Sequence, residues 1–124
     1  MKYARGIDRD DGGAAEEFAS GAVRKKLDDV RYDLISPFGL RRLAMTYAGG
    51  AKKYGDHNWR KGIPFSNLLN HVLSHITLYL AGENGEDHLA HAAFGLFALM
   101  EFEETEPELD DLFCHEGVYL GDLA

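Results

Sequence analysis

Two apolar helical segments joined by a very short polar turn dominate the second half of the chain. Apolar residues recur every three or four positions over 66–81, and an alanine- and leucine-rich segment over 86–104 follows the turn Gly82-Glu83-Asn84-Gly85. This spacing is typical of helices that bury one face, and so short a connection favours antiparallel packing. We therefore predict an antiparallel helical hairpin about residues 82–85, with Ser66 as the N-cap of its first helix and Asp87 in the first turn of its second.

A third amphipathic helix is predicted before the hairpin, from Phe38 to about Lys53, because Pro37 suits a helix start. Residues 54–64 break the period and are expected to form a loop bounded by glycine and proline. Further upstream, the sequence favours a short helix from Ala14 and another over Ala22–Asp29, and the one short strand candidate is Gly117–Leu120.

These segments predict an all-α helical bundle centred on the hairpin. The expected organisation is a polar arm over residues 1–20, a helical domain over 21–106 and an acidic tail over 107–124.

Length and composition exclude several classes of protein. The chain has 124 residues, room for one core, and its 45% hydrophobic and 27% charged residues are ordinary globular values that argue against disorder. No apolar run approaches the ~18 residues of a membrane span, and the first residues lack the apolar stretch of a secretory signal. The single cysteine, Cys114, has no partner for an internal disulfide. We expect a cytoplasmic protein without a membrane partner.

Charge is distributed very unevenly along the chain. All 13 Lys and Arg residues lie between Lys2 and Lys61, so the first 61 residues carry a net charge of +4 and residues 62–124 a net charge of −12. The basic part can attract anions and the acidic part cations, although nine of the twelve later acids could simply form a solvated tail after Met100. The total of −8 argues against a nucleic-acid partner.

Histidines and carboxylates gather around the predicted hairpin turn. His71 and His75 share one helical face at spacing i, i+4, and His88 and His91 share one at i, i+3. Antiparallel packing would place His75 and His91 at similar heights, and the turn adds three acids, namely Glu83, Glu86 and Asp87. Imidazoles and carboxylates that converge from facing helices are how helical bundles build divalent-metal sites. The alternative is that the histidines lie at a helix interface between subunits.

Basic and aromatic residues gather in the loop after the Phe38 helix. The group consists of Lys52, Lys53, Tyr54, Asn58, Trp59, Arg60 and Lys61. Guanidinium and ammonium groups bind phosphates, and flat aromatic rings can stack on a base. The alternative is a solvated basic loop anchored by a buried Trp59. The chain has neither a Gly-rich P-loop nor a nucleophile elbow, and its lone cysteine without a defined partner argues against a thiol enzyme.

Three motifs carry a family resemblance. Residues 31–37 read RYDLISP, residues 51–60 read AKKYGDHNWR, and the hairpin contains GE at 82–83 and HLAHA at 88–92. Together they resemble the phage dATP/dGTP diphosphohydrolase family, a compact relative of the MazG-like all-α nucleoside triphosphate pyrophosphohydrolases, over roughly residues 21–104. The chain departs from MazG-like enzymes where they carry E-x-x-E and E-x-x-D, since its hairpin has His71, Ser74 and His75, then His88 and His91.

The resemblance implies a metal-dependent attack of water that releases pyrophosphate, with a helical homodimer or homotetramer as the working unit. The expected cofactor is Mg2+ or Mn2+, and the substrate is a purine (deoxy)nucleoside triphosphate, dGTP or GTP and also dATP. One member type, called MazZ, serves phages that replace adenine with 2-aminoadenine, and there the dGMP produced feeds synthesis of the 2-aminoadenine nucleotide. Such an enzyme would act in the host cytoplasm.

Charge layout, histidine cluster and resemblance together predict the site residues. The catalytic acids are Glu83, Glu86 and Asp87; the metal ligands are His71, His75, Glu83, Asp87, His88 and His91; and the substrate-binding residues are Arg31, Lys53, Tyr54, Asn58, Trp59 and Arg60. Two other functions remain open: a His/Asp metal phosphohydrolase that releases triphosphate or single phosphate from a nucleotide, and a non-catalytic helical binding module. An oligomer is expected on a further ground, because Leu89 through Met100 is too apolar for the surface of a lone small bundle.

Overall fold

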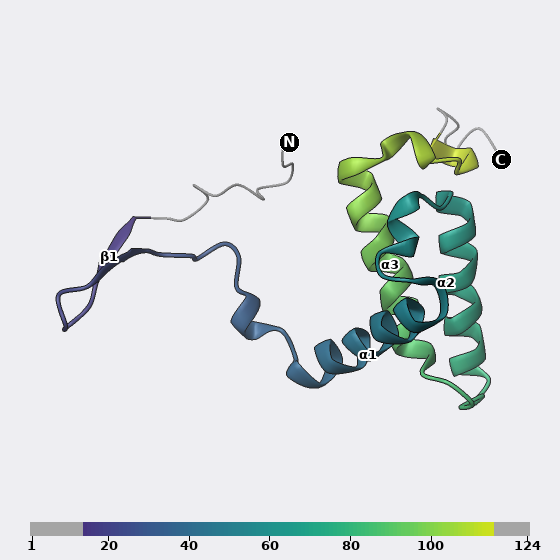
Figure 1. Cartoon of the computed structure of the whole chain (residues 1–124), viewed down its shortest axis with the longest axis horizontal. Helices are drawn as coiled ribbons and strands as arrows, with labels where there is room; N and C mark the ends of the chain where they lie inside the picture. Colours follow the sequence, from purple (N-terminus) through teal and green to yellow (C-terminus); the bar gives the residue numbers. More distant parts are fainter. Residues whose placement is uncertain (1–13, 116–124) are drawn as a thin grey trace. The chain divides into compact units, whose positions relative to one another are not determined.

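A computed structural model describes residues 14–115, which divide into two units between Ser36 and Pro37. The second unit contains the helices α1 (Pro37–Tyr54), α2 (Phe65–Leu80) and α3 (His88–Thr105) (Figure 1). Three short 3-10 helices accompany them, namely η2 (Asn58–Lys61), η3 (Pro107–Leu109) and η4 (Phe113–His115). The three helices lie close to their predicted limits, so the prediction of a mostly helical fold is confirmed.

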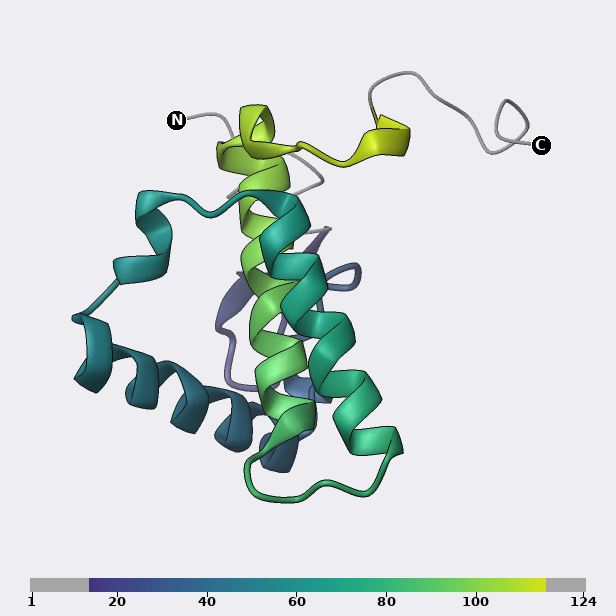
Figure 2. The same cartoon turned by 90° about the vertical axis from the view of Figure 1, so that its right-hand side faces the viewer.

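The predicted hairpin is formed by α2 and α3, which lie side by side and are joined at one end by a short loop (Figure 2). Its core consists of Phe65, Leu68, Ala98 and Phe102. The two helices approach so closely that a Cβ on Gly95 would lie 2.5 Å from Cγ2 of Val72. Glycine at this position therefore sets the separation of the two helices.

Both hairpin helices are capped where they join the connecting loop. At the end of α2, Gly82 has a φ of 85°, its N–H donates to the carbonyl of Tyr79, and the N–H of Glu83 donates to the carbonyl of Leu78. This is a Schellman motif, and it fixes the backbone at Glu83. At the start of α3, Asp87 accepts a hydrogen bond from the N–H of Ala90. Asp87 is therefore the N-cap itself and not a first-turn residue, which corrects its predicted position.

The start of α2 corrects a second prediction. Ser66 lies inside the first turn, not at the N-cap, and both its backbone N–H and its Oγ donate to the carboxylate of Asp111, at 2.8 and 2.6 Å. An acid from the end of the chain thus satisfies a donor that the helix itself leaves unpaired. Leu109 and Leu112, from the same segment, pack against the hairpin core. The domain limits at residues 20/21 and 106/107 stay predictions.

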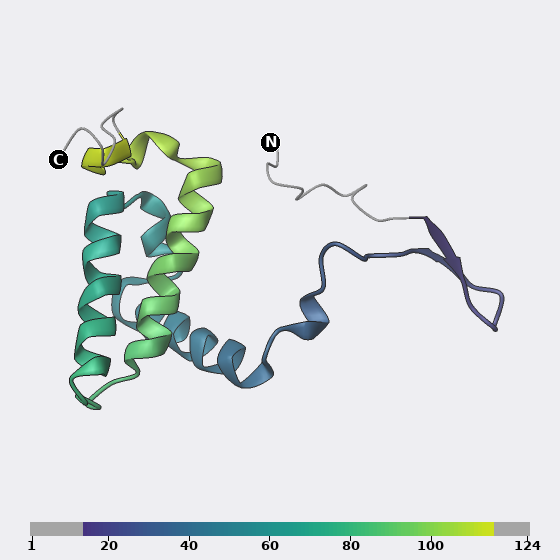
Figure 3. The same cartoon turned by 180° about the vertical axis from the view of Figure 1, so that it is seen from behind.

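Helix α1 packs against α3 (Figure 3). Tyr47 of α1 meets Phe94 of α3 edge-on, with ring centroids 4.9 Å apart. Trp59 of η2 lies 6.1 Å from both of these rings and 5.8 Å from Phe102. The aromatic cluster therefore ties α1 and η2 to the middle of α3.

Much of the apolar surface of the hairpin is exposed. Leu96, Phe97 and Met100 of α3 and Leu73 of α2 are 44–54% exposed. The buried apolar residues of α3 are Ala90, Ala92, Ala98 and Phe102. Several apolar side chains of the segment Leu89–Met100 are thus exposed in the single chain, as the sequence analysis expected.

The described part of the first unit is a β-hairpin followed by a 3-10 helix, η1 (Tyr32–Leu34). Its strands β1 (Ala15–Glu17) and β2 (Val23–Lys25) are antiparallel, with Glu16 opposite Arg24. The helices predicted from Ala14 and over Ala22–Asp29 are therefore wrong. A charged stretch this short does not offset the cost of starting a helix without packing, whereas Gly21, with a φ of 90°, closes a turn between two strands of opposite charge.

Two further sequence predictions concern a membrane span and a strand near residue 120. Within 14–115, no helix combines the length and the apolar run that crossing a membrane would demand. The strand candidate Gly117–Leu120 lies outside the described residues.

Candidate active site

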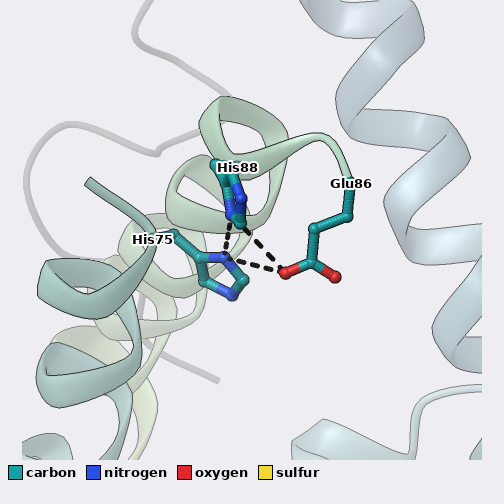
Figure 4. A group of neighbouring side chains, drawn as sticks. All are labelled: His75, Glu86 and His88. Atoms are coloured by element: carbon teal, nitrogen blue, oxygen red, sulfur yellow. Dashed lines mark hydrogen bonds and ion pairs between the residues drawn. The ribbon is translucent and has the colours of Figure 1, made fainter. Parts of the chain in front are cut away.

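Two histidines and a glutamate face one another at the loop end of the hairpin (Figure 4). His75 lies on α2, His88 opens α3, and Glu86 lies in the loop between them. The two Nδ1 atoms are 3.0 Å apart, and Oε1 of Glu86 lies 3.4 Å from Nδ1 of His75 and 3.5 Å from Nδ1 of His88. Among the described residues, this is the one group of three potential ligand atoms that is close enough to hold a metal ion. We refer to these residues as the His75–Glu86–His88 triad.

The spacing of the triad suits one metal ion. Three donor atoms separated by 3.0–3.5 Å leave a point from which each can be reached at about 2.0–2.1 Å, the usual length of zinc bonds to imidazole nitrogen and carboxylate oxygen. Burial lowers the pKa of His75, and the neighbouring His91 lowers it further. A neutral imidazole is the form that binds a metal, so the donor set fits a divalent cation.

Glu83 contacts the far side of the His88 ring. Its carboxylate pairs with Nε2 of His88 and also accepts a hydrogen bond from the N–H of Gly85. These two interactions lower the pKa of Glu83, the bond to His88 contributing most. Since a carboxylate only accepts hydrogen bonds, the neutral His88 ring carries its proton on Nε2, and the lone pair of Nδ1 then faces the triad. His88 is 3% exposed, so its ring is held by packing as well.

His91 lies beside the triad. Its Nδ1 is 2.7 Å from the main-chain carbonyl of Asp87, an acceptor, so Nδ1 carries a proton and, in the neutral ring, Nε2 has the lone pair. The ring stacks on His75, with centroids 5.0 Å apart. The expectation that His75 and His91 lie at similar heights is therefore confirmed.

The Asp87 carboxylate is engaged elsewhere. Arg42 of α1 donates to both of its oxygens, at 2.6 and 2.8 Å, and the N–H of Ala90 donates to one of them. The bond from Arg42 is the main reason why the pKa of Asp87 falls to about 2. The structure thus does not bring this carboxylate into the triad. His71 also lies outside it, on an exposed part of α2.

A cavity of about 410 Å³ opens beside the triad. Its walls include Glu83, Glu86 and His88, together with Arg42 and Tyr79. The ligand atoms of the hairpin loop therefore border a space into which a polar group could enter.

An aromatic pocket of about 310 Å³ lies between the end of α1 and η2. It is lined by Tyr47, Ala48, Gly50, Ala51, Tyr54, Gly55, Asp56, His57, Asn58, Trp59 and Phe94. Three of the predicted substrate-binding residues, Tyr54, Asn58 and Trp59, are therefore brought together in one concave surface. A pocket of this size and aromatic character is typical of small-molecule sites.

The three predicted phosphate-binding cations, Lys53, Arg60 and Arg31, have different surroundings. Arg60 lies over the Trp59 ring, donates to Nδ1 of His57 at 2.5 Å and pairs with Glu101. Lys53 lies over the Tyr54 ring, with its Nζ 5.2 Å from the centroid. Arg31 belongs to the first unit, where it forms a two-pronged pair with Asp33. Lys53 and Arg60 thus each lie over an aromatic ring of the pocket wall, although neither lines the pocket itself.

Helix α3 connects the pocket to the triad. His88 belongs to the triad and Phe94 to the pocket, and six residues correspond to about 9 Å along a helix axis. The same helix therefore supplies a side chain to each site, about 1.7 turns apart.

Sequence analysis missed several residues of this arrangement. Arg42, Tyr47 and Phe94 belong to regular helices, where they are indistinguishable from ordinary surface or core residues. Asp56 lies inside the motif that carried the family resemblance, so its position next to Asn58 and Trp59 was a usable signal.

Comparison with known proteins identifies the family. The family model described as "dATP/dGTP diphosphohydrolase, N-terminal" matches residues 19–112. A dATP/dGTP diphosphohydrolase of Salmonella phage PMBT28 is 36% identical over 84 residues, which cover 63% of this chain. The chain spans only 28% of the length of that relative. No solved structure matches. The resemblance seen in the motifs is confirmed: this chain belongs to the dATP/dGTP diphosphohydrolase N-terminal family.

Proposed function

We propose that the protein is a metal-dependent diphosphohydrolase of purine (deoxy)nucleoside triphosphates. It would convert dGTP or GTP, and also dATP, to the monophosphate and pyrophosphate. The observation that carries the proposal is the His75–Glu86–His88 triad, and helix α3, which supplies His88 to it, also supplies Phe94 to an aromatic pocket large enough for a base. The name of the phage relative supports the same reaction.

The triad would hold the ion. A bound divalent cation, Mg2+ or Mn2+, neutralises phosphate oxygens and makes a coordinated water more acidic. In the reaction, water attacks the α-phosphorus, the bond from this phosphorus to the α–β bridging oxygen breaks, and pyrophosphate leaves with that oxygen. The free Nε2 lone pair of His91, next to His75, could accept the proton released by the water.

The aromatic pocket would take the base. Tyr54 is 61% exposed, so its ring is accessible for stacking, whereas Trp59 also packs on the hairpin core. Asp56 lines the same pocket, and among the described residues no hydrogen bond or ion pair involves its side chain. A carboxylate accepts hydrogen bonds, and guanine offers an N–H and an amino group on its pairing edge where adenine lacks this pair. Asp56 therefore favours guanine.

Lys53 and Arg60 would bind the phosphates. Each lies over a ring of the pocket wall, and a guanidinium paired with a partly exposed carboxylate can exchange that partner for a phosphate. The Arg60–Glu101 pair is about half exposed on the Arg60 side, so little free energy opposes the exchange. Arg31 is proposed as a further phosphate ligand on the strength of the motif that contains it.

The proposal extends to a phage setting. The relative is a phage protein, and the motifs resemble the member type that serves genomes containing 2-aminoadenine. The dGMP produced in the host cytoplasm would then feed synthesis of the 2-aminoadenine nucleotide. A homodimer or homotetramer is also proposed, because exposed Leu96, Phe97 and Met100 form an apolar surface that a second copy could cover. Light scattering during gel filtration gives the number of copies.

The test is an incubation of the protein with dGTP, GTP, dATP and dCTP, in the presence of Mn2+, of Mg2+ or of EDTA, with the products resolved by chromatography. The expected result is metal-dependent formation of purine monophosphate together with pyrophosphate. Release of triphosphate or single phosphate would instead indicate a different metal phosphohydrolase. No turnover by folded, metal-loaded protein would indicate a non-catalytic binding module.

A further inference from the structure

We propose that the triad selects a transition-metal ion of the series from Mn2+ to Zn2+ over Mg2+, and that Glu83 is the positioning residue that prepares His88 for this ion. The inference deepens the proposed function by naming the class of metal. The role of the ion in catalysis rests on the proposed function, whereas the choice of metal does not, because metal binding is measured without substrate.

The donor set gives the first reason. Two of the three triad atoms are imidazole nitrogens, the Nδ1 atoms of His75 and His88, and only Glu86 offers oxygen. Mg2+ strongly prefers oxygen ligands and keeps much of its water, whereas imidazole suits Zn2+, Fe2+ and neighbouring ions. Two histidines and one carboxylate leave the remaining positions of a six-coordinate ion open for water or phosphate oxygens.

The hydrogen-bonding state of His88 gives the second reason. Glu83 pairs with Nε2 of His88, so the opposite nitrogen is left with a lone pair toward His75 and Glu86. Carboxylates that bind the far nitrogen of a ligand histidine are a recurrent feature of metal centres, because they fix both the tautomer and the ring orientation. Glu83 itself is placed by the Schellman turn at Gly82 and by the N–H of Gly85.

The His75 ring is supported from the other side. His91 stacks on it, and the His91 ring is in turn fixed by the Asp87 carbonyl. Asp87 is held by Arg42. The titratable or charged groups around the two ligand histidines therefore comprise Glu83, Glu86, His91 and His71, with Asp87 and Arg42 behind them. Of these, Glu86 alone completes the triad, which leaves a preorganised site for one ion.

The experiment is calorimetric titration of the apo protein with Mn2+, Co2+, Zn2+ and Mg2+ in the absence of nucleotide, with Co2+ absorption spectra as a second readout. We expect one transition ion per chain and an affinity at least about 100-fold above that for Mg2+. His75→Gln and Glu86→Gln should each abolish this selectivity, and thermal unfolding of the apo variants checks that they fold. Equal affinity for Mg2+ and Co2+, or unchanged Co2+ binding by folded His75→Gln, would overturn the proposal.

Glu83→Gln tests the positioning role. Because the amide holds the His88 tautomer less firmly, we expect Co2+ affinity to fall about 10- to 100-fold with a changed visible spectrum. Glu16→Gln, the same change on the exposed strand β1 of the other unit, is the matched control and should leave both readouts unchanged. If Glu83→Gln binds Co2+ like wild type and gives the same spectrum, Glu83 does not position His88.

The two proposals can fail separately. Selective binding of transition ions without turnover of any nucleotide would refute the proposed function and leave this inference intact. Turnover supported by Mg2+ with an affinity that His75→Gln does not alter would refute the inference and leave the reaction intact.

Discussion

Arg42 in α1 and Asp87 at the N-cap of α3 form a two-pronged ion pair, with Nη2 2.6 Å from Oδ1 and Nε 2.8 Å from Oδ2. The pair joins two elements 45 residues apart in the sequence. Since the next residue along the chain is His88 and the Asp87 carbonyl holds His91, this ion pair fixes the backbone from which two of the histidines project. Its effects should appear in stability and in its dependence on pH.

We expect Asp87→Ala to destabilise the protein by about 1 kcal/mol, the usual contribution of an N-cap side chain. Asp87→Asn keeps an amide oxygen that can cap α3 and loses only the charge, so it should cost clearly less. Urea unfolding followed by circular dichroism measures both. If the two variants are equally destabilised, the cap contributes nothing and the ion pair carries the effect.

The pH dependence of stability should also report on Asp87. Its pKa is lowered from 3.8 to about 2 in the folded protein, so the ionised carboxylate stabilises the fold above pH 3.8. This contribution is lost as the pH falls through the interval from 3.8 toward 2. The difference in unfolding free energy between wild type and Asp87→Asn should therefore shrink over that interval. A difference that stays constant from pH 6 to pH 2 would contradict the assignment.

Asp111→Ala should lower the thermal midpoint by a few degrees. The substitution removes the acceptor of the Ser66 N–H and hydroxyl bonds and so leaves the start of α2 without its cap. Differential scanning calorimetry measures the change. Asp28→Ala, an exposed acid of the first unit, serves as the control and should have almost no effect on the midpoint. Equal midpoints for Asp111→Ala and wild type would show that the contact does not stabilise the helix.

Tyr54→Ala should raise KM for dGTP about tenfold with little change in kcat, because stacking on a base contributes ~1–3 kcal/mol. The ring is exposed at the pocket edge, so its removal should spare the fold. Steady-state kinetics provides the measurement. Tyr32→Ala removes another exposed ring, from η1, and an identical KM increase in that variant would argue against a specific role of Tyr54.

Asp56→Asn should reduce discrimination between dGTP and dATP. The amide replaces one acceptor by a donor, so the contact with guanine weakens while adenine gains a possible partner. We expect the ratio of kcat/KM values for dGTP and dATP to fall about tenfold. The ratio is measured with both nucleotides competing in one reaction. An unchanged ratio would place base selection elsewhere in the pocket.

Helix periodicity, the glycine turn and the histidine spacing sufficed to predict the hairpin and the facing of His75 and His91. The same patterns failed for residues 14–29, because a short charged stretch carries no periodic signal that separates a helix from an exposed hairpin. The patterns also misplaced two residues relative to the helix starts: Ser66 lies in the first turn of α2 and not at its N-cap, and Asp87 is the N-cap of α3 and not in its first turn. Cap positions depend on hydrogen bonds to distant or backbone partners, which periodicity does not encode.

The amino-acid sequence by itself determined which residues form the helices and which chemical groups, histidines, acids and a basic aromatic loop, gather near the hairpin. Local hydrogen bonding and burial of an apolar face act over a few residues and so leave a periodic mark. Tertiary structure alone decided that Glu86 joins His75 and His88, that Asp87 turns to Arg42, and that Tyr47 and Phe94 close the pocket around Trp59. The triad depends on the register of α2 against α3, and the other two contacts depend on how α1 crosses the hairpin. Packing sets both relations.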